Sequence, residues 1–152
     1  MADHAFHVTG NGSVTVTVLG RQFPDAQHYD DACWLDVLVD VQVPGYTAHF
    51  GGTFLRNDEL EEFASELKRM HATLKGKSAL RTMECMIYLE AEVNKLGQIR
   101  WTGETVFPIG DGNTLQFTLE NDQSFLPGLI RELDNILKAF PIRGKRPESR
   151  RP

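Results

Sequence analysis

The stretch that decides the fold runs from residue 57 to residue 76 and reads NDELEEFASELKRMHATLKG. Its apolar residues recur at spacings of three and four, which is typical of a helix with one buried stripe. Asn57 can accept a backbone N–H at the exposed helix start, and Gly76 can adopt the left-handed conformation that ends many helices. These signals predict an amphipathic helix from Asn57 to Leu74.

A second amphipathic helix is predicted between Ser124 and Phe140. Pro127 is tolerated near the first turn of a helix, and Pro141 follows the last apolar residue. The apolar stripe of this segment is wide, so it has to pack against other elements.

Most of the remaining chain alternates apolar and polar residues, as half-buried strands do. Such runs cover residues 13–18, 34–43, 46–54, 80–93, 98–107 and 114–119. The connections after residue 80 are too short for parallel crossovers. We therefore predict one α+β domain, residues 1–141, in which an antiparallel twisted sheet of five to six strands carries both helices on one face. No internal sequence repeat is evident.

The core of this domain is predicted from the buried faces of the helices and strands. It should contain Val37, Val39, Leu67, Ile87, Leu89, Leu133 and Ile136. Residues before the first strand and residues 21–31 are predicted to be irregular, since they are polar or contain Pro24 and several acids.

Charge is distributed unevenly along the 152 residues, whose net charge is −5. The segment 143–152 holds five of the 16 bases and one of the 21 acids, so the body carries about −9. An acidic body repels nucleic acid and suits a basic protein partner, although surplus acid also keeps a protein soluble. Residues 142–152 are rich in Gly, Pro and charge and are predicted to form a disordered basic tail.

No motif for catalysis, a cofactor or a metal is present in the sequence. Cys33 and Cys85 are too few for a disulfide framework and are expected to be buried free thiols in strands. The histidines, at positions 4, 7, 28, 49 and 71, lack ligand spacing. The N-terminus lacks the pattern of a secretory signal and no apolar run is long enough to span a membrane, so a cytoplasmic location is expected.

The outward positions of the predicted sheet combine aromatic anchors with carboxylates, which favours a protein-binding face for a basic partner or for a second copy of the chain. The candidate residues are Trp34, Asp36, Asp40, Glu84, Met86, Tyr88, Glu90 and Glu104. Three alternatives stay open: a solvated face without a partner, a small hydrolase that uses two of the carboxylates, and a small-ligand site between sheet and helices. Large side chains should fill that last space: Phe63, Trp101, Phe125 and Phe140.

The order of features resembles a known family of small bacterial proteins. The features are Trp34-Leu35-Asp36-Val37, a Pro-Gly hairpin, a helix opening at Asp58-Glu59-Leu60, a strand with Glu84, Leu115-Gln116-Phe117, and Asp122-Gln123 with Leu126 before the last helix. Over residues 14–141 this order is similar to that of the WapI-type immunity proteins and related uncharacterised families. The resemblance implies a non-enzymatic protein that neutralises a toxin domain by binding it, with no catalytic residues.

Overall fold

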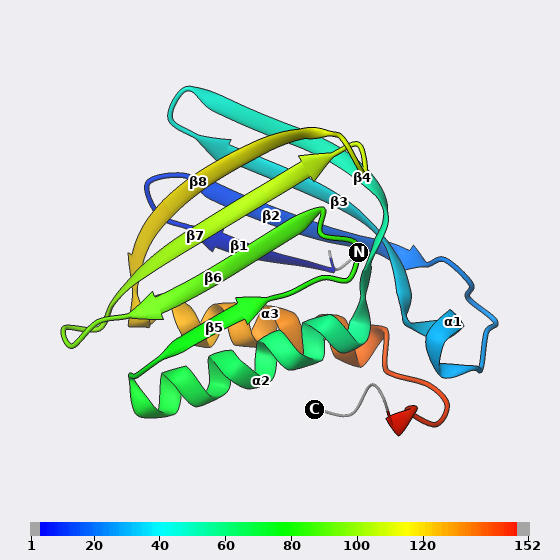
Figure 1. Cartoon of the computed structure of the whole chain (residues 1–152). Coiled ribbons are helices and arrows are strands. Elements are labelled where there is room, and N and C mark those ends of the chain that lie inside the picture. The colour runs from blue at the N-terminus through cyan, green and yellow to red at the C-terminus, as the bar shows by residue number, and fades with distance from the viewer. Residues whose placement is uncertain (1–3, 149–152) are drawn as a thin grey trace.

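The computed structural model describes residues 4–148, which form two four-stranded antiparallel sheets and the helices that cover them (Figure 1). Sheet A has the order β1-β2-β3-β4, with β1 (Ala5–Thr9), β2 (Ser13–Arg21), β3 (Trp34–Val43) and β4 (Tyr46–Arg56). Sheet B has the order β5-β6-β7-β8, with β5 (Lys77–Leu80), β6 (Ile87–Val93), β7 (Gln98–Phe107) and β8 (Asn113–Asp122).

Two long helices lie side by side under the sheets (Figure 1). Helix α2 (Asn57–Thr73) follows sheet A but packs beside β5 of sheet B. Helix α3 (Leu126–Ala139) follows sheet B, after the short 3-10 helix η1 (Gln123–Phe125), and packs beside β1 of sheet A. A short helix, α1 (Tyr29–Cys33), precedes β3. Each helix therefore covers the edge of the sheet that it does not follow, which ties the two halves together.

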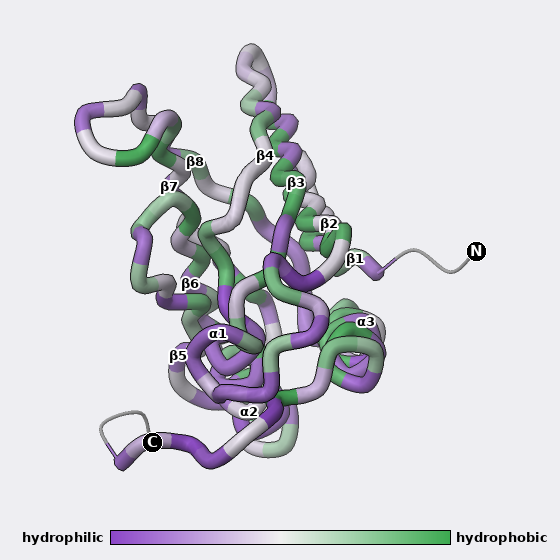
Figure 2. The backbone as a smooth tube through the Cα atoms, turned by 90° about the vertical axis from the view of Figure 1, so that its right-hand side faces the viewer, coloured by the Kyte–Doolittle hydropathy of each residue, from purple (hydrophilic) through white to green (hydrophobic). Residues whose placement is uncertain are grey.

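The architecture is a repeat of four strands and a helix, although the sequence shows no repeat. In Figure 2, sheet A lies on the right, sheet B on the left, and α2 and α3 below them. The inward residues of both sheets and of both helices share one core. Trp101 and Phe63, both almost fully buried, meet edge to face with ring centroids 6.4 Å apart.

The α+β class, the antiparallel pairing and the helices on one side are confirmed, and the single sheet of five to six strands is wrong. Residues 80–93, predicted as one strand, contain the end of β5 and all of β6, and Leu80 pairs with Leu89. Residues 81–86 turn the chain between them, and Cys85 adopts a positive φ of 56° there. Strand β1 also lies in a segment predicted to be irregular.

Helix α2 begins one residue away from the predicted cap. Arg56 is the N-cap, and its backbone N–H donates to Glu59 Oε1 at 2.8 Å in a capping box. The Asn57 side chain instead donates to the carbonyl of Phe140 at 3.0 Å, at the end of α3. A polar residue predicted to cap one helix thus joins the two helices.

The predicted core is confirmed. All seven of its residues, Val37, Val39, Leu67, Ile87, Leu89, Leu133 and Ile136, have 0% exposure. Cys33 is buried as predicted but lies at the end of α1, whereas Cys85 is exposed because its segment turns rather than pairs. No helix in the described part of the chain is long and apolar enough to cross a membrane.

Residues 141–148 run back along the body. The Arg143 guanidinium donates to the carbonyl of Pro24 at 2.7 Å, and Arg146 donates to Glu61 at 2.6 Å. The Arg146 guanidinium also lies 5.6 Å from the centre of the Tyr29 ring. The remainder of the predicted basic tail, residues 149–152, lies outside the described residues.

Candidate partner-binding surface

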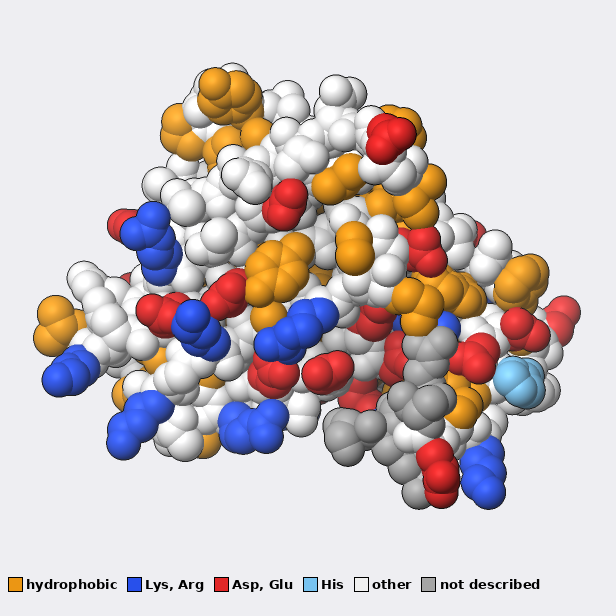
Figure 3. All heavy atoms as spheres, in the orientation of Figure 1, with side chains coloured by type: hydrophobic (Ala, Val, Ile, Leu, Met, Phe, Trp, Pro, Cys, Tyr) orange, Lys and Arg blue, Asp and Glu red, His pale blue; other side chains and the backbone are white. Residues whose placement is uncertain are grey.

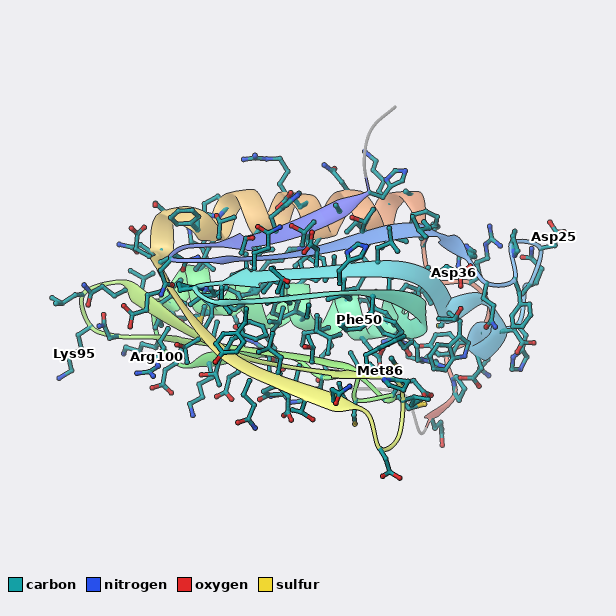
Figure 4. The ribbon with its side chains drawn as sticks, turned by 90° about the horizontal axis from the view of Figure 1, so that it is seen from above. Asp25, Asp36, Phe50, Met86, Lys95 and Arg100 are labelled. Carbon is teal, nitrogen blue, oxygen red and sulfur yellow. The ribbon has the colours of Figure 1, made fainter. Side chains whose placement is uncertain are left out.

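The structure divides the eight candidate residues between two sheets. Sheet A carries Trp34, Asp36 and Asp40, all on β3. Sheet B carries Tyr88 and Glu90 on β6 and Glu104 on β7, while Glu84 and Met86 belong to the turn before β6. In Figure 4, Asp36 belongs to one sheet and Arg100 to the other. The candidates therefore form two separate faces.

The outer face of sheet A, here called the acidic face, is built from the outward positions of β2, β3 and β4. Its residues are Ser13, Thr15, Thr17, Leu19, Asp36, Leu38, Asp40, Gln42, Thr47, His49, Gly51 and Thr53. Asp40 lies between Thr15 and His49 in the strand register. Asp36 accepts a hydrogen bond from the Thr53 hydroxyl. No Lys or Arg occupies any of these positions.

The absence of Lys and Arg from the acidic face reflects their scarcity in the whole first third of the sequence. Arg21 is the one Lys or Arg among residues 1–55 of the sequence. It is only 8% exposed, and its guanidinium donates to the carbonyls of Ala32 and Pro141. Its charge is therefore held inside the fold. Arg56, at the end of β4, is the other base of sheet A and is also buried.

A buried charged cluster lies beside the acidic face, at the junction of β4 and α2. The Arg56 guanidinium is paired with Asp58 at 3.0 Å and with Asp30 at 3.1 Å. Burial alone lowers the pKa of Arg56, but the hydrogen bonds and charges of the two carboxylates outweigh it and raise that pKa. The Trp34 ring covers this guanidinium, with 5.1 Å from Cζ to the ring centroid. Trp34 is thus partly engaged inside the protein.

Glu59 is a half-buried carboxylate that the sequence interpretation did not single out. It accepts the backbone N–H of Arg56 at 2.8 Å and that of Met83 at 2.6 Å, so it links α2 to the turn before β6. Burial raises its pKa to about 7, against the lowering effect of these two bonds. The available signal was its position three residues after the N-cap, where a capping box places Glu.

The outer face of sheet B carries paired charges of both signs. The Lys77 ammonium is 3.3 Å from Glu90 and 3.1 Å from Glu92. The Tyr88 hydroxyl donates to Glu90 at 2.8 Å, and Tyr88 stands opposite Glu104 on β7. Figure 3 looks onto this side of the molecule and shows basic and acidic side chains interspersed. Glu90 and Glu92 therefore have partners within the protein.

Met86 does not point outward as predicted. Its side chain is 5% exposed and belongs to the core, because the turn at residues 81–86 ends the alternation on which its orientation was based. Glu84, in the same turn, is half-buried. The outer faces still carry apolar side chains, among them Tyr88 on sheet B and Leu19 and Leu38 on sheet A, and Leu38 lies over Gly51.

Two hollows in the surface bear on the alternatives of an enzyme and of a ligand site. A hollow of about 450 Å³ is lined by Gln22, Phe23, Pro24, Asp25, Ala26 and Asp31. A second, of about 310 Å³, is lined by Glu66, Arg69, Met70, Thr73, Lys75, Gly76, Lys77 and Arg81. The first hollow is lined by two carboxylates, Asp25 and Asp31, and neither hollow contains any of the eight candidate partner-binding residues. Within residues 4–148, no group of three or more His, Cys, Asp or Glu side chains could hold a metal ion.

The space between sheets and helices is filled as predicted by Phe63 and Trp101, and Phe140 is half-buried there. Trp101 Nε1 donates to Asn121 Oδ1 at 2.9 Å, which satisfies its one polar atom. Phe125 is instead 44% exposed, because it lies in η1 before the regular helix begins.

Comparisons with known proteins agree with this description. A crystal structure of Trypanosoma brucei MRP1/MRP2 is similar to this chain, with a TM-score of 0.50 and 12% identity over 91% of this chain and 86% of that one. At this identity the similarity concerns the fold alone. No curated protein matches the sequence. The family model of the WapI-like immunity proteins matches residues 6–141, and the chain belongs to the Immunity protein WapI-like family.

Proposed function

We propose that this protein is a non-enzymatic immunity protein that neutralises a toxin by binding a basic surface of it with the acidic face of sheet A. Membership of the WapI-like immunity family supports the general role of binding a protein toxin. The observation that carries the choice of face is the separation of charge along the chain, since residues 1–55 hold one base and that base is buried.

Unpaired carboxylates attract a cationic partner more strongly than paired ones do. On sheet B, a partner would have to displace Lys77 from Glu90 and Glu92 before it gained the same contacts. On sheet A, Asp40 faces Thr15 and His49 in the strand register, and Asp36 accepts a hydrogen bond from the neutral Thr53 hydroxyl. Electrostatic complementarity of this kind raises the association rate and excludes acidic competitors.

Among the eight candidate residues, Asp36 and Asp40 are the charged contacts to the partner, and Trp34 is an aromatic residue at the side of the surface. Leu38 adds an apolar contact between the two carboxylates, and it is 37% exposed. The sheet B candidates Tyr88, Glu90 and Glu104, together with Glu84, form the competing surface. A homodimer through either face is the competing assembly.

Capture followed by a neutralisation assay tests the proposal. The tagged chain is used to isolate a binding protein from its host, and the isolated protein is then expressed in a sensitive strain with and without this chain. We expect growth arrest by the captured protein alone and restored growth when this chain is co-expressed. Growth that is unaffected in both cases would contradict the immunity function.

Matched charge reversals test the face. Asp40→Lys should weaken binding about tenfold or more, as replacement of a close charge contact does in other complexes. Glu104→Lys makes the same change at a strand position of sheet B and should leave binding within about twofold. The opposite pattern, with loss in Glu104→Lys and retention in Asp40→Lys, would place the partner on sheet B. Light scattering of the free chain identifies a homodimer.

A further inference from the structure

The edge of sheet A formed by β4 differs from the other three sheet edges. The β1 edge packs against α3, and the β5 edge packs against α2. The β8 edge is charged at Glu120 and Asp122, and the Glu120 backbone N–H donates to Asn11 Oδ1 at 3.0 Å. Among the described strands, β4 pairs with β3 alone. Its second edge therefore has no strand and no long helix along it.

The turn before β4 determines which backbone groups face outward. Pro44 and Gly45 form a two-residue hairpin loop, with Val43 opposite Tyr46. Residues that flank such a loop exchange hydrogen bonds, and the bonded pairs then recur at every second residue. The N–H and C=O groups of Thr47, His49 and Gly51 consequently point away from β3. Three consecutive outward positions form a template for one more strand.

This edge also lacks the features that normally prevent strand addition. Charged residues, prolines and coverage by other elements protect the exposed edges of natural sheets. From Tyr46 to Leu55, β4 contains no Lys, Arg, Asp, Glu or Pro. Tyr46 is 66% exposed at the start of the strand, and hydrophobic side chains gather over the β3–β4 hairpin at the upper left of Figure 3.

The two sides of an added strand would meet different surroundings. On the outer side lies Gly51, opposite Leu38, whose side chain lies over it between Asp36 and Asp40 of β3. An added strand would be about 10 Å from β3, within reach of a long basic side chain meeting an aspartate. On the inner side, the Phe50 ring stacks on Phe107 at 5.1 Å, and Phe107 is 43% exposed.

We infer that β4 accepts an extended segment of a cationic partner as a fifth strand of sheet A. Basic side chains of the segment alternate with apolar ones, so that the basic ones lie on the acidic face and reach toward Asp36 and Asp40, and the apolar ones contact Phe50 and Phe107. Backbone pairing supplies affinity, and the alternate side chains supply selectivity. This inference rests on the proposed function and adds the mode by which the partner binds.

A defined peptide tests the inference on the whole chain. The probe is an octapeptide of alternating Lys and Val with blocked ends, titrated to about 1 mM, the range of weak strand addition by a short peptide. We expect the amide protons of Thr47, His49 and Gly51 to shift in NMR spectra and to exchange more slowly with solvent. The same peptide N-methylated at alternate residues, on the edge that would pair with β4, should bind about tenfold more weakly.

Two protein variants complete the test. His49→Pro removes an outward N–H without removing a bond to β3, and it should weaken the probe about fivefold to tenfold. His49→Ala keeps the backbone donor and should bind within about twofold of the parent. If the His49→Pro variant does not fold, Thr47→Pro is used in its place, since it removes another outward N–H of β4.

The inference is overturned if the probe leaves these amides unchanged, if the methylated and unmethylated peptides bind equally, or if slowed exchange is confined to other strands. Slowed exchange at the same three amides in the free chain, growing with protein concentration, would show that a second copy occupies β4. If Asp40→Lys abolishes neutralisation while His49→Pro neutralises like the parent, the partner binds the acidic face but does not add a strand to β4.

Discussion

The two sheets have the same topology but use charge in opposite ways. In sheet A, the bases are few and buried, so Arg21 and Arg56 stabilise the interior while Asp36 and Asp40 remain outside. In sheet B, Lys77 lies on the surface and pairs with carboxylates of the sheet, and Arg81, just after β5, pairs with Glu66 of α2. Lys95 and Arg100 lie at the end of the molecule opposite Asp25 (Figure 4). One fold unit can therefore present carboxylates on a face without surface bases, while its counterpart presents carboxylates paired with bases.

The largest expected effect comes from the buried base beside sheet A. Arg56→Ala removes a guanidinium that is 1% exposed and leaves Asp58 and Asp30 without it. Loss of one partner from a buried ion pair costs about 3–5 kcal/mol. Urea unfolding should show this loss in the free energy of unfolding. Arg100→Ala, a surface change on sheet B, should cost less than about 0.5 kcal/mol, and equal losses would contradict the contrast between the sheets.

A smaller effect is expected at the junction between the two halves. Burial raises the pKa of Glu59 from 4.5 to about 7, so the folded state binds this proton more tightly than the unfolded state does. The stabilisation is complete below about pH 4.5 and is lost as the pH rises to about 7, amounting to at most about 3 kcal/mol. Glu59→Gln should reduce the difference in unfolding free energy between pH 4.5 and pH 7.5.

The matched control for this prediction is Glu104→Gln, which neutralises a carboxylate away from the junction. An unchanged pH profile in Glu59→Gln would show that Glu59 is not the group responsible.

The sequence predicted the elements whose local signals agree and failed where one residue interrupts a pattern. Helix α2 combines an apolar stripe with acidic residues in its first turn, and β3 alternates over ten residues, so both were identified. The alternation from Leu80 to Val93 hid a turn, since Met83 and Cys85 are apolar enough to pass for core positions. Strand β1 is five residues long, too short for a periodic signal.

The sequence predicted several of the residues of the candidate surface correctly, but it did not predict that they lie on two different sheets. Alternation correctly placed Asp36 and Asp40 on an outer face, because β3 is unbroken. It could not reveal that Tyr88 and Glu104 belong to a different sheet, because strand pairing depends on contacts far apart in the sequence. The scarcity of Lys and Arg before residue 56 is visible in the sequence alone, and it is the signal that distinguishes the two faces.

Glycine-to-alanine changes in the two sheets should have intermediate effects on stability, and the effects should differ between the sheets. A Cβ at Gly103, on the inner side of sheet B, would lie 2.2 Å from the Phe117 ring. Gly103→Ala should therefore cost about 1–3 kcal/mol by overpacking. On the outer side of sheet A, a Cβ at Gly51 would meet the end of the flexible Leu38 side chain at 2.7 Å. Gly51→Ala should cost less than about 1 kcal/mol, and thermal unfolding of both variants checks the order.

The smallest effect on stability is expected from the surface ion pair of sheet B. Lys77→Met removes a cation near Glu90 and Glu92, and exposed pairs contribute little because solvent screens them. The urea midpoint should stay at the parental value. The pKa of Glu90 is lowered first by the Tyr88 hydrogen bond and then by Lys77, so it should rise in the variant while remaining below its ordinary value. An NMR titration of the Glu90 side chain measures this change. A pKa that does not move would show that Lys77 leaves Glu90 unpaired, and sheet B would then offer free carboxylates as sheet A does.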